Sequence, residues 1–339
     1  MADALLILDG GLFSTLQDEG RFGYARFGIS PAGAMDAVAL RLATALVGGP
    51  AGMAAVECTL NGPTFTVEAD LCRLAFAGAE TRVTLNGTPI PTHRAFDAAR
   101  GDRVAVGPCA EGLRGYLAVG GGFAVPPVLG SRSTHSRSAL GGLEGRALRA
   151  GDRLPLAAPC TDGPCLELPP AHRPRWGWTA RVLLGPQDDF FTAEGIAAFL
   201  SSAYTVSDRA DRMGCQLDGP AVAHRNGFNI VSDGIVNGSI QVPGHGRPVV
   251  LLADRQTTGG YPKIATVIGP DLPVLAQARP GSALRFAAVS AEEAERIVDE
   301  EHCQLAAMLA AIAPASGPPA LTSEHLLANN LISGVHRAD

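Results

Sequence analysis

Residues 251–268, LLADRQTTGGYPKIATVI, place polar side chains directly after an apolar run that is typical of a buried strand. They include Lys263, the one lysine among the 27 basic residues of the chain. Because arginine carries almost all the positive charge, a retained ammonium favours a compact or titratable cation in a site over a surface charge. We therefore predict that Lys263 and Arg255 are catalytic.

Further polar residues of this segment, with one from the nearby SIQVPGHGRP stretch, are predicted to bind substrate: Gln256, Thr257, Thr258, Gly259, Gly260, Tyr261 and Gln241. Polar groups that follow an apolar strand are well placed to form a site. The alternative is a hairpin turn with exposed polar residues, in which the lysine is retained by chance.

Two segments of the N-terminal half carry a second group of candidates. The stretch STLQDEGRFGYARFGISPAGAMD places Asp18 and Arg21 among glycines, which permit the tight backbone paths on which loop sites are built. The stretch LGSRSTHSRSALGGLEGRAL contains Arg132 and Ser133, and arginine with hydroxyls can hold a carboxylate or phosphate. We predict that Asp18 is catalytic and that the other three bind substrate. The alternatives are a turn with a solvated Asp–Arg pair and a serine-rich surface loop.

The composition argues against several classes of function. A net charge of −6 gives no whole-molecule attraction for nucleic acid or anionic lipid. Seven scattered cysteines suit reduced thiols, and neither zinc-finger spacing nor HExxH is present, so we predict no metal site. The apolar stretches are strand-sized and the N-terminus lacks the basic start of a signal peptide, so we expect a cytoplasmic protein without membrane spans.

The residues around Lys263 also argue against a nucleotide-binding P-loop and against covalently attached biotin. The lysine lies in Pro-Lys-Ile and not in GK[ST], so the chain has no P-loop. Biotin carriers present their lysine between methionines, so we expect no biotin attached to this chain. ATP or biotin chemistry would therefore involve another chain.

The pattern of the whole sequence predicts a mainly β protein with a few helices. Many short strands lie between turns, and helices are expected over about 34–47, from Thr192, and from Ser290, where Glu293 completes a capping box. The proline-rich run AAPCTDGPCLELPPAHRPRW marks a boundary. We predict an N-terminal domain over 1–165, a C-terminal domain over 166–313 that ends in a helix, and a tail over 314–339.

Several of these segments together resemble the biotin-dependent carboxyltransferase family, also called allophanate hydrolase subunit 2. The motifs QDEGRFGYARFGISPAGAMD, ECTLNGPTF, LGSRST, DRMG and GSIQVPGHGRPVVLLADRQTTGGYP occur in the family's order over roughly residues 5–290. The resemblance implies two cyclophilin-like β-barrel domains. One departure is DRMGCQLDG, where Cys215 and Gln216 replace the aromatic residue and arginine that are usual after Met-Gly.

Among free-standing members, the likeness is greatest to those that serve prokaryotic ATP-dependent 5-oxoprolinases as the C subunit. It implies hydrolysis of 5-oxoproline to glutamate with ATP, together with a KipI-like partner (the B subunit) and a LamB/YcsF-like partner (the A subunit). Arginine and lysine would stabilise the transferring phosphoryl group or the substrate carboxylate, with Asp18 or Asp254 as candidate bases. The resemblance leaves two alternatives open, which are the carboxyltransferase part of a biotin-dependent urea carboxylase and a KipA-like regulator of a kinase inhibitor.

Overall fold

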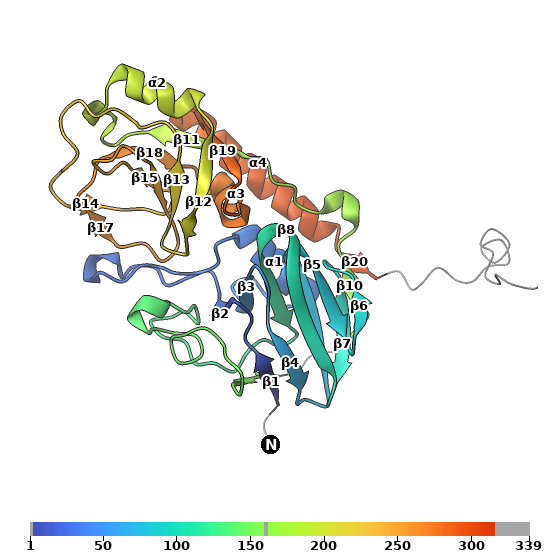
Figure 1. Ribbon diagram of the computed structural model, residues 1–339. Helices are drawn as coiled ribbons and strands as arrows, with labels where there is room; N and C mark the ends of the chain where they lie inside the picture. Colours follow the sequence, from blue (N-terminus) through green and yellow to red (C-terminus); the bar gives the residue numbers. More distant parts are fainter. Residues whose placement is uncertain (1–2, 159–161, 316–339) are drawn as a thin grey trace, which may run out of the picture.

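The computed structural model describes residues 3–158 and 162–315, and within them the chain forms two β-rich domains that lie side by side (Figure 1). The N-terminal domain is built on a nine-stranded sheet. Its strands are β1 (Ala4–Asp9), β2 (Phe13–Gln17), β3 (Ala55–Thr59), β4 (Thr64–Val67), β5 (Leu71–Leu85), β6 (Thr88–Ile90), β7 (Ala95–Ala99), β8 (Arg103–Val119) and β9 (Arg153–Pro155).

The two long strands β5 and β8 form the centre of this sheet. The main path runs β2-β3-β8-β4-β1-β9, and β5 pairs with β8 and also carries β6 and β7. Three register shifts between Gly78 and Val83 interrupt the β5–β8 ladder, and such bulges bend a sheet. The described strands form a half-barrel and not a closed one, so the prediction of two barrels holds fully only for the C-terminal domain.

The C-terminal domain is a closed seven-stranded barrel in the order β11-β18-β15-β16-β13-β12-β19. All its pairs are antiparallel except β11 with β19, which is parallel. Its strands are β11 (Thr179–Leu184), β12 (Tyr204–Ala210), β13 (Gly214–Asp218), β15 (Ser239–Gln241), β16 (Val249–Leu251), β18 (Lys263–Val267) and β19 (Ala283–Ala288). Two further pairs lie outside the barrel: β14 (Asp233–Gly234) with β17 (Thr258–Gly259), and β10 (Leu166–Glu167) with β20 (Ala313–Pro314).

Four α-helices complete the described chain: α1 (Ala37–Leu46), α2 (Ala193–Ser201), α3 (Leu272–Gln277) and α4 (Ala291–Ala310). The first predicted helix begins later than expected, at Ala37, because Asp36 caps it by accepting a hydrogen bond from the Ala39 amide. The predicted N-cap Thr192 and the capping box of Ser290 with Glu293 are both present.

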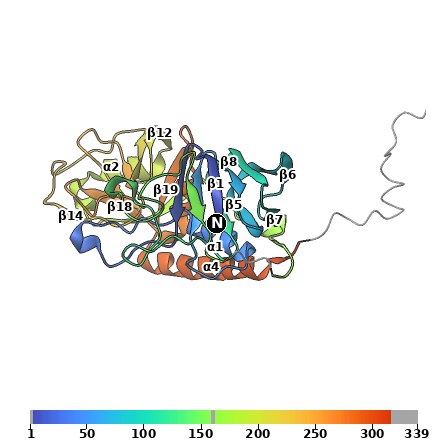
Figure 2. The same ribbon diagram turned by 90° about the horizontal axis from the view of Figure 1, so that it is seen from below.

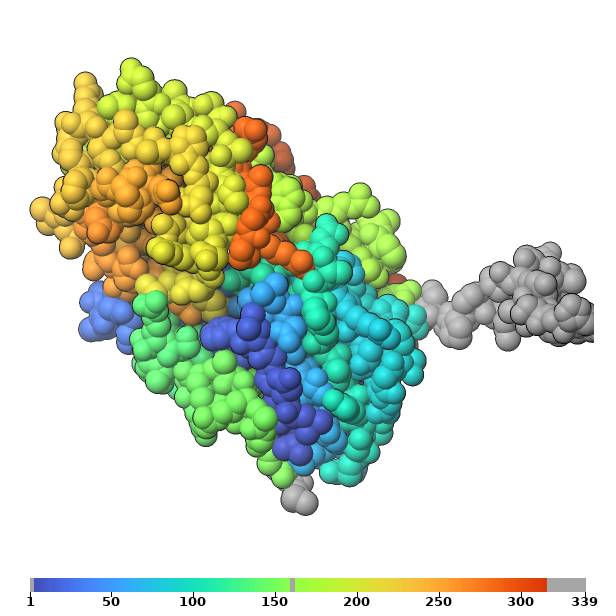
Figure 3. Space-filling model, viewed as in Figure 1, coloured from blue at the N-terminus to red at the C-terminus, as the bar shows by residue number. Residues whose placement is uncertain are grey.

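Helix α4 contacts both domains and runs along one side of the molecule (Figure 2). Near its start, Ala294 and Ile297 pack with Ile268 of the C-terminal domain. Near its end, Met308 and Leu309 pack on the cluster around α1, β5 and β8. The helix thus fixes one domain against the other, and the space-filling view shows the two domains in broad contact (Figure 3).

Two parts of the predicted domain plan stay predictions. Strand β10 starts at Leu166, directly after the expected boundary, but its partner β20 includes Pro314 of the predicted tail. The rest of that tail, residues 316–339, lies outside the described residues. No described helix has the length and apolar character needed to cross a membrane.

Candidate functional site in the cleft between the domains

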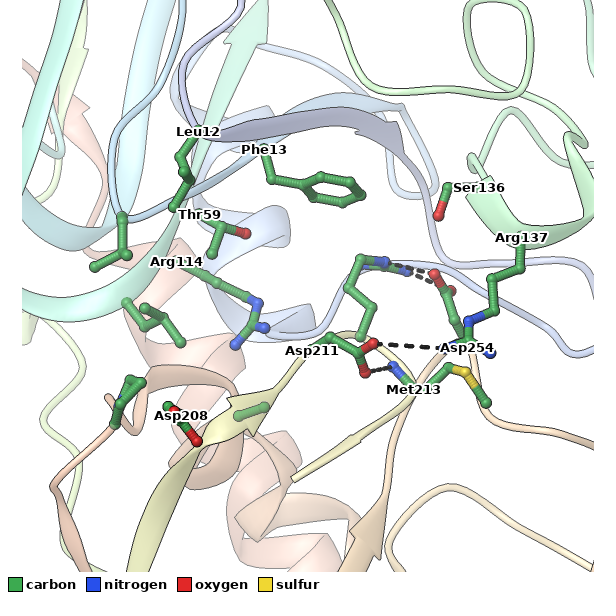
Figure 4. Close-up of a pocket in the computed structure, with 15 residues that line it drawn as sticks. Leu12, Phe13, Thr59, Arg114, Ser136, Arg137, Asp208, Asp211, Met213 and Asp254 are labelled. Carbon is green, nitrogen blue, oxygen red and sulfur yellow. Dashed lines mark hydrogen bonds and ion pairs between the residues drawn. The ribbon is translucent and has the colours of Figure 1, made fainter. Parts of the chain in front are cut away.

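The interdomain cleft is a cavity of about 390 Å³ that residues from both domains line (Figure 4). Its volume lies within the usual range for small-molecule sites. The N-terminal domain contributes Leu12, Phe13, Thr59, Leu60, Leu113, Arg114, Ser136 and Arg137, and the C-terminal domain contributes Asp208, Ala210, Asp211, Arg212, Met213, Asp254 and Pro280. The cleft therefore combines an apolar wall with three arginines and three aspartates.

A buried ion triad closes the floor of the cleft and joins the two domains. Arg212 donates from Nε and Nη2 to both oxygens of Asp254, at 3.0 and 2.9 Å. Its Nη1 lies 2.5 Å from Oε1 of Glu57 in the N-terminal domain, and Nη2 also donates to the Gly33 carbonyl at 2.7 Å. The three charged side chains are at most 5% exposed. Opposite charges in contact offset the cost of burial, so the triad is held as a unit.

The surroundings of Glu57 lower its pKa. Burial alone would raise its pKa, but the nearby guanidinium groups of Arg212 and Arg114 outweigh burial and the pKa lies below its usual value. Oε2 of Glu57 also accepts from the Met35 amide at 2.8 Å and from the Tyr116 hydroxyl at 2.7 Å. Glu57 is therefore an ionised and fully engaged carboxylate, which makes it a poor candidate for a free general base.

Arg114 enters the cleft from β8 on a backbone that the C-terminal domain holds in place. Oε1 of Gln277, at the end of α3, accepts from the amides of Leu113 and Arg114 at 2.9 and 3.0 Å. Its Nε2 donates to the Arg114 carbonyl at 2.9 Å and to Asp36 at 2.8 Å. One buried amide thus has all its hydrogen-bonding capacity satisfied across the domain boundary.

The predicted catalytic residue Asp18 lies beside the cleft and organises the loop that borders it. Its carboxylate accepts from the hydroxyls of Ser131 and Ser133, both at 2.6 Å, from the Arg132 amide at 2.6 Å and from the Gly20 amide at 2.9 Å. Burial would raise the pKa of Asp18, but these hydrogen bonds together lower it by more, so the group is a stable anion. The loop that Asp18 holds continues into Ser136 and Arg137 of the cleft.

The structure brings the other predicted residues of the N-terminal half to this same loop. Arg21 is 1% exposed and donates from Nη2 to the carbonyl of Ser133 and from Nε to that of Val128. Arg132 donates from Nε to the Val125 carbonyl at 2.7 Å. The alternative of a solvated pair of Asp18 with Arg21 is wrong, because both side chains are buried.

Lys263 is 2% exposed and lies at one end of the barrel, outside the lining of the cleft. Its Nζ donates to Asp233 at 2.7 Å, and its backbone amide donates to the Gln187 side chain at 3.1 Å. The hydrogen bond from Lys263, with those from Gly234 and Gln187, lowers the pKa of the half-exposed Asp233 to about 2. The lysine therefore joins β18 to the β14–β17 ribbon.

The remaining predicted residues surround this ribbon. Arg255 donates to the carbonyls of Ile235 and Leu252 at 3.3 and 3.2 Å, and burial lowers its pKa to about 10, against the opposing effect of Asp254. Gln241 donates to the Tyr261 carbonyl at 3.2 Å. The other predicted substrate-binding residues of this segment are exposed or half-buried: Gln256, Thr257, Thr258, Gly259, Gly260 and Tyr261.

The predicted catalytic and substrate-binding residues thus form two groups, one around Asp18 and one around Lys263, and neither group lines the cleft, whereas Asp254, the other candidate base, does. Sequence reasoning missed Arg114 and Arg212, which line the cleft, and Glu57, which pairs with Arg212. Two of them lay in motifs already noted, ECTLNGPTF and DRMG, but no spacing linked these motifs to each other. The described residues include no group of three or more His, Cys, Asp or Glu side chains that could hold a metal ion.

The comparisons with known proteins agree over almost the whole chain. The family model "Carboxyltransferase domain, subdomain A and B" matches residues 27–288. The chain is 39% identical to the C subunit of 5-oxoprolinase from Escherichia coli and 37% identical to that from Haemophilus influenzae, in both cases over 86% of this chain and 93% of the relative.

Among solved structures, the urea amidolyase of Kluyveromyces lactis matches with a TM-score of 0.83 at 29% identity, over 94% of this chain. This chain spans only 21% of that larger enzyme. The family resemblance of the sequence is confirmed, and the chain belongs to the carboxyltransferase family that is built from subdomains A and B.

Proposed function

We propose that this chain is the C subunit of a heteromeric ATP-dependent 5-oxoprolinase, which hydrolyses 5-oxoproline to glutamate. The observation that carries the proposal is the 39% identity to a relative named as the C subunit of 5-oxoprolinase, over 93% of that relative's length. The matched family model covers residues 27–288, which include every residue that lines the interdomain cleft except Leu12 and Phe13.

The chemistry of the reaction suits the contents of the cleft. A lactam is stabilised by amide resonance, and phosphorylation of its carbonyl oxygen by ATP removes that stabilisation, so that water can attack the carbonyl carbon, the C–N bond of the ring can break and phosphate can leave. Arginines that are fixed before the substrate arrives would stabilise the substrate carboxylate or the charge on the transferred phosphoryl group. An apolar wall that includes Phe13 and Leu113 would pack against the methylene groups of the ring.

The complex would supply what this chain lacks. The sequence has no GK[ST] phosphate loop, so we place ATP in the complex, with the KipI-like and the LamB/YcsF-like proteins as partners. We also propose that biotin is not attached here, and the burial of Lys263 against Asp233 supports this.

We keep Lys263, Arg255 and Asp18 as proposed catalytic residues, and the structure suggests how each would act. The ion pair of Lys263 with half-exposed Asp233 lies where the ribbon meets solvent, so a partner or substrate anion could take the place of Asp233. Arg255, with a lowered pKa, would be a second cation at the same end of the barrel. Asp18 would act through the loop that it holds at the rim of the cleft.

The test is ATP-dependent release of glutamate from 5-oxoproline by this chain mixed with its co-encoded KipI-like and LamB/YcsF-like partners. We expect activity in the complete mixture and none when any chain or ATP is omitted. A complete mixture of folded, associated proteins that releases no glutamate would refute the proposal.

A second candidate is carboxyl transfer to urea or a related amide, because the urea amidolyase of Kluyveromyces lactis matches 94% of this chain with a TM-score of 0.83. This reaction would need a biotin carboxylase and a biotin carrier from other chains. Bicarbonate-dependent carboxylation of urea that avidin blocks would select this candidate over the hydrolase.

A further inference from the structure

Arg114 is the one cleft arginine that is both buried and left with unused donors among the described residues. It is 4% exposed, and its Nη1 donates to the Ala276 carbonyl at 2.6 Å. Its Nε is enclosed by protein and has no hydrogen-bond partner in the described part of the chain. Its guanidinium points into the space that the cleft residues surround (Figure 4). Its Nη2 also has no hydrogen-bond partner in the described part of the chain and, unlike Nε, is not an enclosed atom, so a ligand in the cleft that accepts from Nη2 would satisfy this donor.

Each of the other two arginines of the cleft lacks one of these two features. Arg212 uses Nε, Nη1 and Nη2 on Asp254, Glu57 and the Gly33 carbonyl, so it has little left to offer a ligand. The Arg137 side chain is 64% exposed and lies 3.9 Å from Asp211, which makes it a hydrated cation at the rim.

The position of Arg114 is fixed before any ligand arrives. Both its backbone amide and its carbonyl are bound by the buried side chain of Gln277, and its Nη1 is bound by the same segment of the C-terminal domain. A preorganised guanidinium loses little conformational entropy when it binds a planar anion in bidentate fashion.

The charges around Arg114 limit which anions the cleft can accept. Glu57 is engaged with Arg212, whereas Asp208 and Asp211 bring negative charge to the C-terminal side of the cleft. These aspartates disfavour polyanions, while the apolar wall of Leu12, Phe13 and Met213 favours a ligand with a compact hydrocarbon part.

We propose that Arg114 recognises the carboxylate of a small monoanionic ligand with an apolar ring or chain, and so sets the specificity of the cleft. The identity of this ligand as 5-oxoproline rests on the proposed function, but recognition of the carboxylate by Arg114 does not. The competing explanation is that Arg114 only neutralises Glu57, whose charge attracts it.

The experiment compares two ligands that differ in the carboxylate alone, 5-oxoproline and 2-pyrrolidinone, by calorimetry on the full-length chain by itself and within the reconstituted complex. The wild type should bind 5-oxoproline more tightly by about 10- to 100-fold, the range expected for hydrogen bonds to a charged group. Arg114→Gln should remove this preference, whereas Arg247→Gln, at an exposed ion pair, should leave it unchanged.

Arg114→Lys guards against loss of folding, because it keeps the charge opposite Glu57 but loses the planar fork. We expect it to fold as the wild type does and to lose most of the preference for the carboxylate. Two results would overturn the proposal: a wild type, alone and in the complex, that does not distinguish the two ligands, and a folded Arg114→Gln or Arg114→Lys that keeps the full preference. A complex that releases glutamate with the same KM after Arg114→Lys would refute this inference and leave the proposed function standing. Binding that depends on the carboxylate, in a complete complex that releases no glutamate, would refute the proposed function and leave this inference standing.

Discussion

Replacing Arg212 by methionine tests whether the buried triad holds the two domains together. The change removes five hydrogen-bond donors and leaves Glu57 and Asp254, at 1% and 4% exposure of their side chains, without their shared counter-charge. Removing one partner from a buried ion pair costs about 3–5 kcal/mol, because the remaining charge stays desolvated. We expect a loss of this size in the free energy of unfolding at pH 7.5.

The loss should depend on pH in a direction that Glu57 determines. In the wild type its pKa is lowered, so its contribution to stability is present above the unfolded pKa and is lost as the pH falls through the folded pKa. Arg212→Met removes the larger of the two guanidinium charges that oppose burial, so the folded pKa of Glu57 should rise and protonation should stabilise the variant in acid. The difference in stability between wild type and variant should therefore shrink between pH 8 and pH 5.

Urea denaturation across this pH range, followed by fluorescence and circular dichroism, measures the difference. Arg247→Met is the matched control, because it breaks a pair with Asp218 whose side chains are 52% and 49% exposed and should cost less than about 1 kcal/mol. A loss for Arg212→Met no greater than that of the control, or one that does not change with pH, would refute the argument that the triad is desolvated.

Three further predictions concern single residues outside the cleft. Asp18→Asn places an amide NH₂ among the donors that now bind the carboxylate, so we expect a cost of about 1–3 kcal/mol and faster hydrogen exchange in residues 131–137; unchanged exchange would contradict the role of Asp18 in holding that loop. Lys263→Met should abolish glutamate release by the reconstituted complex, whereas Asp233→Asn, which keeps the cation, should not; equal effects on turnover would reduce Lys263 to a structural tie. Ser290→Ala removes the capping box of α4 and should lower the free energy of unfolding by about 1 kcal/mol in a urea titration. An unchanged free energy of unfolding would show that the capping box does not stabilise the helix.

The local structure could be predicted from the sequence wherever short-range chemistry decides it. The capping box of Ser290 with Glu293 and the N-cap at Thr192 are formed by neighbours in the chain, and both are present in the structure. The many short strands also indicated the mainly β fold. Whether each sheet closes into a barrel could not be predicted in this way. Closure depends on the tilt and stagger of the strands and not on the alternation of polar and apolar residues within one strand.

The cleft could not be predicted in the same way. Glu57, Arg114 and Arg212 lie on β3, on β8 and in the turn after β12, and they meet only when the two domains pack. The lone lysine was conspicuous as a residue type, whereas these arginines were hidden among many others. The number of arginines is a poor guide here, because Arg212 and Arg114 are equally buried and only the saturation of their hydrogen bonds separates them.

The cleft and the domain interface are made of the same side chains, and this links stability to recognition. Gln277 fixes Arg114 from across the boundary, and Arg212 fixes Asp254 beside it through Glu57 of the other domain. Any change in the relative position of the domains must therefore move the donors of Arg114 or break a buried ion pair. The high cost of breaking that pair keeps the cleft in one geometry, which is what recognition of a small planar anion requires.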